Sequence, residues 1–405
     1  MAVGWQAPEF LHPVAGVRLG VAEAAIKKPG RKDLLLIELV SGTRVAGVFT
    51  QSSFAAAPVL VCREVLASGA AVRALVVNAG NANAATGQGG LDDARDVAKS
   101  VAAALGCDAG QVLPFSTGVI GQRLPVARMT AAMPAAQADL RADGWLDAMR
   151  AIMTTDTVGK GATRRVPTSQ GEVTVTGIAK GVGMIHPNMA TMLAYVATDA
   201  RLTPAAVDAA LKTAVSRSFN CVTVDGDTST NDSCVLMATA QVGGADVEAG
   251  SADYALIYQA IEQVCLELAH AIVRDGEGAT KFVTIEVGGA SDAAAARQVA
   301  LAVAHSPLVK TALFASDANW GRIVMAIGKS GVPVEPARVD LWLDDVCLLR
   351  GGQPHPDYHE DLGAAVVARD EFAIRIGLGA GGASATVWTC DFSYDYVKIN
   401  AEYRT

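Results

Sequence analysis

Lys180-Gly-Val-Gly-Met-Ile-His-Pro-Asn-Met-Ala-Thr-Met-Leu193 is the stretch around which the chain is organised. Its glycines and Pro187 disfavour a continuous helix or strand, whereas the residues from Met189 to Val196 are apolar enough to be buried. The peptide bond between Ala190 and Thr191 is therefore expected where a constrained loop enters a core element. At that point the chain carries a hydroxyl group directly after a small residue.

A strained bond before threonine offers a specific reaction. The Thr191 hydroxyl can attack the Ala190 carbonyl, move the acyl group from nitrogen to oxygen and release it to water. A new chain then begins at Thr191. Its free α-amino group, with an ordinary pKa of about 7.7 to 8.0, can act as the base that activates the neighbouring hydroxyl. The sequence thus predicts self-cleavage and a threonine nucleophile.

Further motifs stand in a fixed order along the chain. They are Asn78-Ala-Gly-Asn-Ala-Asn83, Pro114-Phe-Ser-Thr-Gly-Val-Ile-Gly121, Met153-Thr-Thr-Asp-Thr157, Thr223-Val-Asp-Gly-Asp-Thr-Ser-Thr-Asn-Asp232, Asp275-Gly-Glu-Gly-Ala-Thr280, Asn319-Trp-Gly-Arg322 and Tyr396-Val-Lys-Ile-Asn-Ala-Glu-Tyr-Arg-Thr405. With these motifs and the Lys180–Leu193 stretch, the sequence resembles the ornithine acetyltransferases, also called bifunctional glutamate N-acetyltransferases of arginine biosynthesis. The resemblance covers the whole chain.

The resemblance implies cleavage into an alpha chain of residues 1–190 and a beta chain of residues 191–405, which stay associated, with two copies of each in the enzyme. It implies transfer of acetyl from N2-acetyl-L-ornithine to L-glutamate through an ester on Thr191. No metal or other cofactor is expected. Whether acetyl-CoA is a second donor is left open.

Site residues can be assigned to motif positions. Thr117 and Gly118 place a hydroxyl beside an approachable backbone N–H, and the resemblance assigns them to the oxyanion hole, where donors stabilise developing negative charge. Lys180 and Glu277 suit the charges of an acetylated amino acid. The substrate contacts that the resemblance implies are Thr154 or its neighbour Thr155, Lys180, Thr191, Glu277, Asn400 and Thr405. The apolar Val397 and Ile399 predict that the C-terminus is held down.

Composition indicates a compact cytosolic protein. The 405 residues are 51% hydrophobic and 18% charged, so the chain can bury a large core. Its net charge of −8 disfavours a nucleic-acid partner. Residues 1–6 show no signal-peptide pattern, and no uninterrupted apolar run approaches the roughly 20 residues of a membrane helix. The seven cysteines are widely spaced and contain no C-x-x-C pair, which favours reduced structural thiols.

Short β-like runs alternate with alanine-rich helical stretches, which predicts an α/β fold of mixed sheets packed with helices, in a layered two-subdomain arrangement shared by both cleavage fragments. Strands are expected at Leu34–Val40, Ala74–Asn78, Val173–Ala179, Thr191–Ala197, Val235–Ala240, Phe282–Val287, Val339–Leu343 and Glu371–Leu378. Helices are expected at 91–105, 204–217, 253–272 and 292–304, the second capped by Thr203. The glycine clusters at 87–90 and 379–382 predict turns.

Three motifs resemble ligand sites without meeting their requirements. The run from Asp225 to Asp232 resembles a calcium loop but has Thr230 and Leu236 where an EF-hand needs Gly and Glu. His355 and His359 have zinc-helix spacing, yet Pro356 favours a loop. The glycines at 159–161 lack the rest of a phosphate-binding loop. His186 is interpreted as structural, because the new α-amino group already supplies a base.

Two other functions fit part of the pattern. An N-terminal-nucleophile amidohydrolase or aminopeptidase would share the self-cleavage but pass the acyl group to water. An uncleaved ligand-binding protein would keep residues 1–405 in one piece. The acceptor of the acyl group and the state of the Ala190–Thr191 bond distinguish these alternatives from an acetyltransferase.

Overall fold

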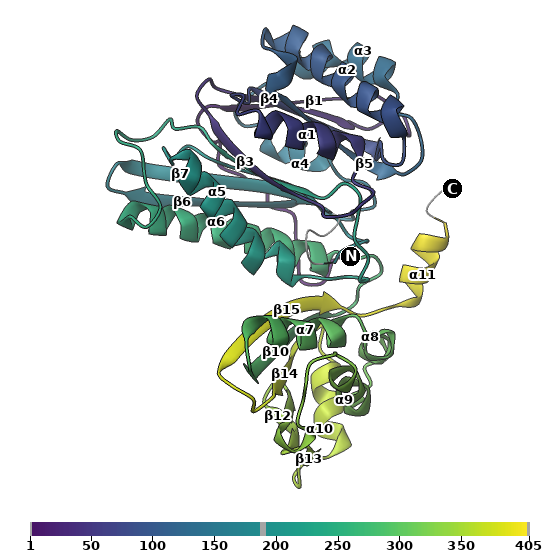
Figure 1. Cartoon of the computed structure of the whole chain (residues 1–405). Helices are drawn as coiled ribbons and strands as arrows, with labels where there is room; N and C mark the ends of the chain where they lie inside the picture. The colour runs from purple at the N-terminus through teal and green to yellow at the C-terminus, as the bar shows by residue number, and fades with distance from the viewer. Residues whose placement is uncertain (1, 187–191, 403–405) are drawn as a thin grey trace.

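The computed structural model describes residues 2–186 and 192–402, arranged as three β-sheets with helices on their faces (Figure 1). The four-stranded sheet has the order β1 (Val17–Ala22), β2 (Leu34–Leu39), β4 (Ala74–Asn81), β5 (Val112–Val119). The five-stranded sheet has the order β3 (Arg44–Phe49), β9 (Ser233–Ala238), β8 (Leu193–Thr198), β7 (Gly171–Lys180), β6 (Lys160–Thr168). The α/β class with mixed sheets is as the sequence predicts.

The four-stranded and five-stranded sheets face each other across one apolar core. Leu35, Val77 and Phe115 of the first sheet pack in the same cluster as Tyr195 and Met237 of the second. Alternate residues of each strand point to this shared core because side chains alternate between the two faces of a sheet. Two short helices, α1 (Ala57–Ala67) and α4 (Trp145–Ala151), contribute side chains to the same cluster.

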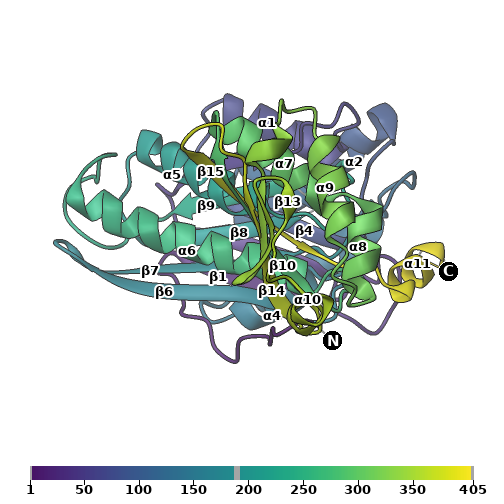
Figure 2. The same cartoon turned by 90° about the horizontal axis from the view of Figure 1, so that it is seen from below.

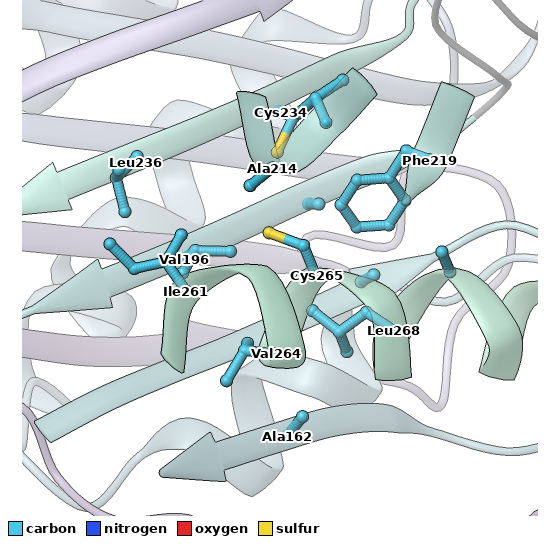
Figure 3. Packing of buried hydrophobic residues seen from close by; sticks show 14 of the residues in the cluster. Ala162, Val196, Ala214, Phe219, Cys234, Leu236, Ile261, Val264, Cys265 and Leu268 are labelled. Atoms are coloured by element: carbon cyan, nitrogen blue, oxygen red, sulfur yellow. The ribbon is translucent and has the colours of Figure 1, made fainter. Parts of the chain in front are cut away.

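Helices cover the outer faces of this pair of sheets and complete four layers (Figure 1). The four-stranded sheet carries α2 (Gly87–Leu105) and α3 (Val126–Ala138), and the five-stranded sheet carries α5 (Pro204–Arg217) and α6 (Ala252–Arg274). Figure 3 shows Ile261, Val264, Cys265 and Leu268 of α6 directed at the strands. Although α6 is long and apolar enough to cross a membrane, its apolar face is buried on this sheet, so core packing accounts for its composition.

A separate six-stranded sheet is built from the C-terminal part of the chain. Its order is β13 (Gln353–Pro354), β12 (Val346–Arg350), β11 (Asp340–Leu343), β14 (Glu371–Gly377), β10 (Phe282–Ala290), β15 (Ala383–Cys390). It has its own core with α7 (Ala293–Ala304), α8 (Pro307–Phe314), α9 (Trp320–Gly328) and α10 (Glu360–Val367) (Figures 1 and 2). The last helix, α11 (Tyr394–Ala401), extends from this unit along the edge of the molecule.

Strands from either side of residues 190 and 191 pair with each other. β8 lies between β7 and β9, antiparallel to β7 and parallel to β9, and β3 pairs with β9. The register places Lys180 opposite Leu193. The five-stranded sheet therefore joins residues 1–190 to residues 191–405 by continuous backbone hydrogen bonds.

All eight expected strands are present, with ends that differ by up to three residues, and residue 191 of the fourth lies outside the described residues. The four expected helices are present as α2, α5, α6 and α7. One expectation is wrong: Gly87–Gly90 is not a separate turn but the first turn of α2. A Cβ on Gly90 would overlap the Thr86 hydroxyl and lie 2.6 Å from Asn83 Oδ1. Gly90 is thus explained by lack of space for a side chain.

We expect Leu268→Ala to lower the free energy of unfolding by about 2–5 kcal/mol, because it leaves a cavity between α6 and the five-stranded sheet. Leu256→Ala on the same helix is the matched control, since Leu256 is 43% exposed whereas Leu268 is 0% exposed. Urea denaturation followed by circular dichroism measures both. Equal shifts of the two midpoints would contradict the packing of α6 described above.

Candidate active site

A cavity of about 120 Å³ opens where β5 and β7 end, between the two facing sheets and the start of the C-terminal unit. It collects residues from segments that are far apart in the sequence. Its lining includes Thr117, Gly118, Thr154, Thr155, Lys180, Glu277 and Asn400, all expected from the sequence to serve the site. The other expected residues, Ala190, Thr191 and Thr405, lie outside the described residues.

Gly118 allows β5 to approach β4 closely at the cavity floor. Its φ of +136° favours glycine, and a Cβ there would overlap the Gly80 carbonyl and lie 2.5 Å from the Asn81 nitrogen. The preceding residue, Thr117, accepts a hydrogen bond at Oγ1 from Lys180 Nζ over 3.3 Å. Because Lys180 is the donor in this contact, the hydroxyl hydrogen of Thr117 remains available to another acceptor.

Lys180 is the last residue of β7, and its side chain is buried, with 4% of the residue exposed. Burial lowers the pKa of its ammonium group, and the nearby carboxylate of Asp156 acts in the opposite direction. A buried cation beside a cavity favours binding of an anion, because each charge offsets the other's loss of hydration. Lys180 is therefore placed to bind a carboxylate.

Beneath Lys180 lies a buried ionic network centred on Lys160. The Lys160 ammonium donates to Asp156 Oδ1 over 2.7 Å and to Asp275 Oδ2 over 2.6 Å. Asp156 also accepts from the backbone N–H groups of Gly181 and Thr154. Burial alone would raise the pKa of Asp156, but the ammonium groups of Lys160 and Lys180 hold that pKa well below its usual range. The network thus ties three segments of the site together.

Glu277 follows α6 and is also buried, with 8% of the residue exposed. Thr155 Oγ1 donates to its Oε1 over 3.1 Å, and Asn400 Nδ2 donates to its Oε2 over 2.9 Å. Burial raises the pKa of this carboxyl, and the two hydrogen bonds oppose the rise. Its side chain lies against Gly183, where a Cβ would be 2.5 Å from Oε2. Glu277 is placed to bind a cationic amine.

The C-terminal helix α11 reaches the site through polar contacts. Besides the contact from Asn400, the Tyr396 hydroxyl donates to Asp225 Oδ2 over 3.3 Å. The expectation that apolar Val397 holds the terminus down is wrong, since Val397 is 66% exposed. Ile399 instead lines a neighbouring cavity. Hydrogen bonding to the carboxylates of Glu277 and Asp225, and not apolar burial of Val397, fixes this helix to the body of the protein.

The calcium-like motif has a structural role. Asp225 accepts the backbone N–H groups of Met184 and Ile185 over 2.6 and 2.9 Å, immediately before the undescribed residues 187–191. His186 lies beside His305, with 3.0 Å between Nδ1 and Nε2. Within the part of the chain that the structure describes, no group of three or more His, Cys, Asp or Glu residues could hold a metal ion.

Sequence reasoning missed the polar residues Ser229, Thr230 and Asn231, which also line the cavity. Asn231 Nδ2 donates to the carbonyls of Ala82 and Ser116 over 2.6 and 2.8 Å, so it fastens β5 to the loop after β4. These residues stand in the motif from Thr223 to Asp232, which supports the family resemblance and resembles a calcium loop, but which the sequence does not assign to the site. A run of small polar residues between apolar segments was the available signal.

The chain re-enters the sheet at Met192, where the described residues resume after the gap. Met192 N–H donates to Asp232 Oδ1 over 3.2 Å, and Ser233 N–H donates to the Met192 carbonyl over 3.0 Å. Asp232 is buried, and burial raises its pKa well above the ordinary value. Leu193 then pairs with Lys180. Met192, which directly follows residue 191, is therefore fixed close to the end of β7, whose last residue, Lys180, lines the cavity.

Together these residues form a small polar cavity with one buried cation, one buried carboxylate and hydroxyl groups between them. Such a cavity suits a small zwitterion or an amino acid derivative, whose opposite charges would meet Lys180 and Glu277. The Thr117 hydroxyl and the Gly118 N–H lie at the same cavity as possible donors to a carbonyl oxygen. The geometry favours acyl chemistry on an amino acid.

Comparison with known proteins gives one consistent result. The model of the family described as the ArgJ family matches residues 18–405. The arginine biosynthesis bifunctional protein ArgJ of Methylococcus capsulatus is 55% identical over 396 residues, which cover 98% of this chain and 97% of that protein.

Two solved structures are also similar. The arginine biosynthesis bifunctional protein ArgJ of Bacillus halodurans is 40% identical with a TM-score of 0.49, and the match covers 51% of this chain and 97% of that one. Ornithine acetyltransferase of Mycobacterium tuberculosis, solved with ornithine, is 38% identical with a TM-score of 0.41, covering 44% and 93%.

We expect Lys160→Met to lower the free energy of unfolding at neutral pH by about 3–5 kcal/mol, because two carboxylates would stay buried without their cation. The lowered pKa of Asp156 contributes stability above the ordinary Asp value of about 3.9, and this contribution is lost as pH falls further. The difference between wild type and variant should therefore shrink in acid.

Urea denaturation between pH 3 and pH 8 measures this difference. Lys212→Met is the matched control, since Lys212 forms an exposed pair with Asp208 that should contribute at most about 1 kcal/mol. A Lys160→Met variant as stable as the control at neutral pH would contradict the structural role of the network.

Proposed function

The chain belongs to the ArgJ family, and on this premise we propose that it transfers acetyl from N2-acetyl-L-ornithine to L-glutamate through an ester on Thr191. It is an enzyme of arginine biosynthesis, a glutamate N-acetyltransferase that also has amino-acid N-acetyltransferase activity. The observation that carries the proposed mechanism is the single cavity that unites Thr117, Gly118, Lys180 and Glu277 beside the start of β8.

Activation begins with cleavage between Ala190 and Thr191. The Thr191 hydroxyl attacks the Ala190 carbonyl, the acyl group moves from nitrogen to oxygen, and water hydrolyses the ester. The pairing of Lys180 with Leu193 supports this proposal, because the connection between them leaves and re-enters the sheet at the cavity. The contacts of Met192 with Asp232 and Ser233 would hold the new chain start in place.

The two fragments, residues 1–190 and 191–405, remain together after cleavage. Support comes from the pairing of β8 with β7 and of β9 with β3, which buries backbone groups that separation would expose. We further propose that two copies of each fragment form the enzyme and that it works in the cytosol. Exposed apolar side chains on α8, α9 and α11, such as Leu308, Met325 and Val397, support association between copies.

In the first half-reaction, the α-amino group of Thr191 takes the proton of the Thr191 hydroxyl, whose oxygen attacks the acetyl carbonyl. The Thr117 hydroxyl and the Gly118 N–H stabilise the oxyanion, a contact that typically contributes about 3 kcal/mol per donor. The bond between the acetyl carbon and the amide nitrogen breaks. Ornithine leaves with the proton, and the acetyl group stays on Thr191.

Substrate groups are held by charge complementarity. Lys180 binds the carboxylate of acetylornithine, and Glu277 binds its free amine. Hydrogen bonds from Thr155 and Asn400 orient the Glu277 carboxylate for this contact. Thr154 and Thr405 complete the proposed substrate contacts. Holding both ends of the substrate fixes the acetyl carbon relative to the nucleophile, which converts an encounter into a unimolecular step.

In the second half-reaction, glutamate enters the vacated site and its α-amino group attacks the acetyl ester. N-acetyl-L-glutamate leaves, and the Thr191 hydroxyl is regenerated. Because the cavity is small, an amino acid that occupies it leaves little room for water to reach the ester. Transfer to an amine therefore competes successfully with hydrolysis.

Thr191→Ala is expected to remain a single chain of 405 residues and to lose all acetyl transfer, because both reactions need the same hydroxyl. Intact mass spectrometry should find fragments 1–190 and 191–405 for the wild type only. Thr311→Val is the control, since this exposed hydroxyl on α8 donates to the carbonyl of Pro307 on its own helix. A Thr191→Ala protein that still splits at this bond would refute the mechanism.

Steady release of ornithine from acetylornithine is expected to require glutamate, because the acetyl ester must be discharged by an amine. Without glutamate, release should stop after about one equivalent per site, the signature of a double displacement. Rapid-quench measurement of ornithine, with and without glutamate, tests this directly. Continuous release independent of glutamate would instead identify an amidohydrolase.

A further inference from the structure

Asp232 is a buried carboxyl at the point where the chain re-enters the five-stranded sheet. It is 0% exposed, directly precedes β9 and follows Asn231, which lines the active-site cavity. Its Oδ1 accepts the Met192 N–H over 3.2 Å. Within residues 2–186 and 192–402, its second carboxyl oxygen, Oδ2, has no hydrogen-bond partner. A buried polar atom without a partner is costly, so a ligand for this oxygen is to be sought.

The charges around Asp232 leave room for a further cation. Burial raises the pKa of the Asp232 carboxyl well above its ordinary value, and the charge of Lys180 acts in the opposite direction. Lys180 also interacts with Asp156, Lys160 and Glu277, so Asp232 has only a share of its charge. Among the described residues Asp232 forms no ion pair of its own. A cation beside Oδ2 would therefore stabilise the carboxylate.

Self-cleavage creates a group of this kind one residue away from Met192. In the uncleaved chain the nitrogen of Thr191 is an uncharged amide, but after cleavage it is an α-amino group that takes up a proton near neutral pH. Three covalent bonds join this nitrogen to the Met192 nitrogen, so the two atoms are at most about 4 Å apart. Since Met192 N–H is held by Asp232 Oδ1, the new amine is tethered within reach of the same carboxyl group.

The amine of the substrate is a weaker candidate for Asp232 Oδ2. Glu277 is already placed for that amine, with its two carboxylate oxygens oriented by Thr155 and Asn400. The chain start, in contrast, is bonded to the residue that Asp232 holds. The amine created by cleavage is thus the ligand that fits the free oxygen best.

We propose that Asp232 is a positioning residue that accepts a hydrogen bond at Oδ2 from the α-amino group of Thr191 and orients this amine as the base of acetyl transfer. The proposal rests on the proposed function, because it needs the chain start that cleavage creates. It deepens that function by adding a third group to the nucleophile and its base. In triads of nucleophile, base and carboxylate, the carboxylate likewise holds the base and stabilises its protonated form.

The proton transfers balance without a further reactant. The working state has a neutral amine beside the Asp232 carboxylate. When the Thr191 oxygen attacks the acetyl carbonyl, the amine takes the hydroxyl proton and becomes an ammonium group, whose charge the carboxylate offsets. The bond between the acetyl carbon and the ornithine nitrogen then breaks, and the ammonium group gives its proton to that nitrogen. Asp232 itself gains and loses no proton.

Asp232→Asn tests the proposal with little change of shape. The amide oxygen can still accept the Met192 N–H, while a donor replaces the acceptor at Oδ2. We expect the variant to cleave itself like the wild type and to keep its KM for acetylornithine within about threefold, but to lose about 100-fold in kcat. Intact mass spectrometry and steady-state release of ornithine measure these quantities.

The pH profile gives a readout that a purely structural change would not move. A neighbouring carboxylate favours the protonated amine and raises its pKa, so removing that charge lowers the pKa of the amine. The acid limb of kcat/KM for Asp232→Asn should therefore lie about one pH unit below that of the wild type. The rate at which cyanate modifies the amine, followed on fragment 191–405 by mass spectrometry, measures the same shift without turnover.

Asp199→Asn is the matched control. Asp199 directly follows the other end of β8, is 5% exposed, and accepts the Thr174 N–H at Oδ1 over 2.7 Å. Burial raises the pKa of this carboxyl too. Its conversion to an amide should leave kcat and the acid limb unchanged. Asp232→Ser is a second test variant, to be used if Asp232→Asn does not fold, because it removes the charge and keeps a small acceptor.

A lower kcat together with a lower acid limb in the Asp232 variant, and neither change in Asp199→Asn, supports the proposal. An unchanged kcat, or a lower kcat with the acid limb in place, overturns it. An Asp232 variant that remains one chain of 405 residues also overturns it, because Asp232 would then act in cleavage and not in transfer. A wild type that is not cleaved before Thr191 refutes the proposed function itself and, with it, this role of Asp232.

Discussion

The buried contact of Lys160 with Asp156 and Asp275 is the interaction on which the site depends. It joins the start of β6, the loop after α4 and the end of α6. Because Asp156 also accepts from Gly181, the same network fixes the backbone that follows Lys180. Buried charges of this kind are stable only when each is paired and hydrogen-bonded. The network therefore sets the relative positions of a cation and a carboxylate that the proposed chemistry needs.

The other residues of the site come from different sheets. The four-stranded sheet supplies Thr117 and Gly118 near the end of its edge strand β5, and the five-stranded sheet supplies Lys180 and the re-entry point at Leu193. The C-terminal unit adds Asn400, although its own sheet has a separate core. A peptide bond cut between β7 and β8 would leave every strand pair intact. Self-cleavage is thus compatible with a fold that stays assembled, because the hydrogen bonds between β7 and β8 and between β3 and β9 join the two fragments.

Apolar runs predicted the buried strands, but several edge strands were missed. β5 contains Pro114 and Gly118, which usually argue against a strand, and both are tolerated because β5 is the last strand of its sheet. β6 carries Arg164, Arg165 and Pro167. Charged residues and proline keep an edge strand from pairing with other chains, but they also interrupt the apolar pattern by which a strand is recognised in the sequence. Helix α11 has no buried residue, so no apolar periodicity revealed it.

The sequence by itself determined the α/β class, the buried strands, the family resemblance and the residue types needed for acyl transfer to an amino acid. These follow from local patterns and motifs. Only the tertiary structure decided that Lys180 and Glu277 are buried in one cavity, that Asp156, Lys160 and Asp275 support them, and that a buried carboxyl lies where the chain re-enters the five-stranded sheet. The reason is that these residues come from distant segments, and their proximity depends on sheet pairing and packing, which no local pattern records.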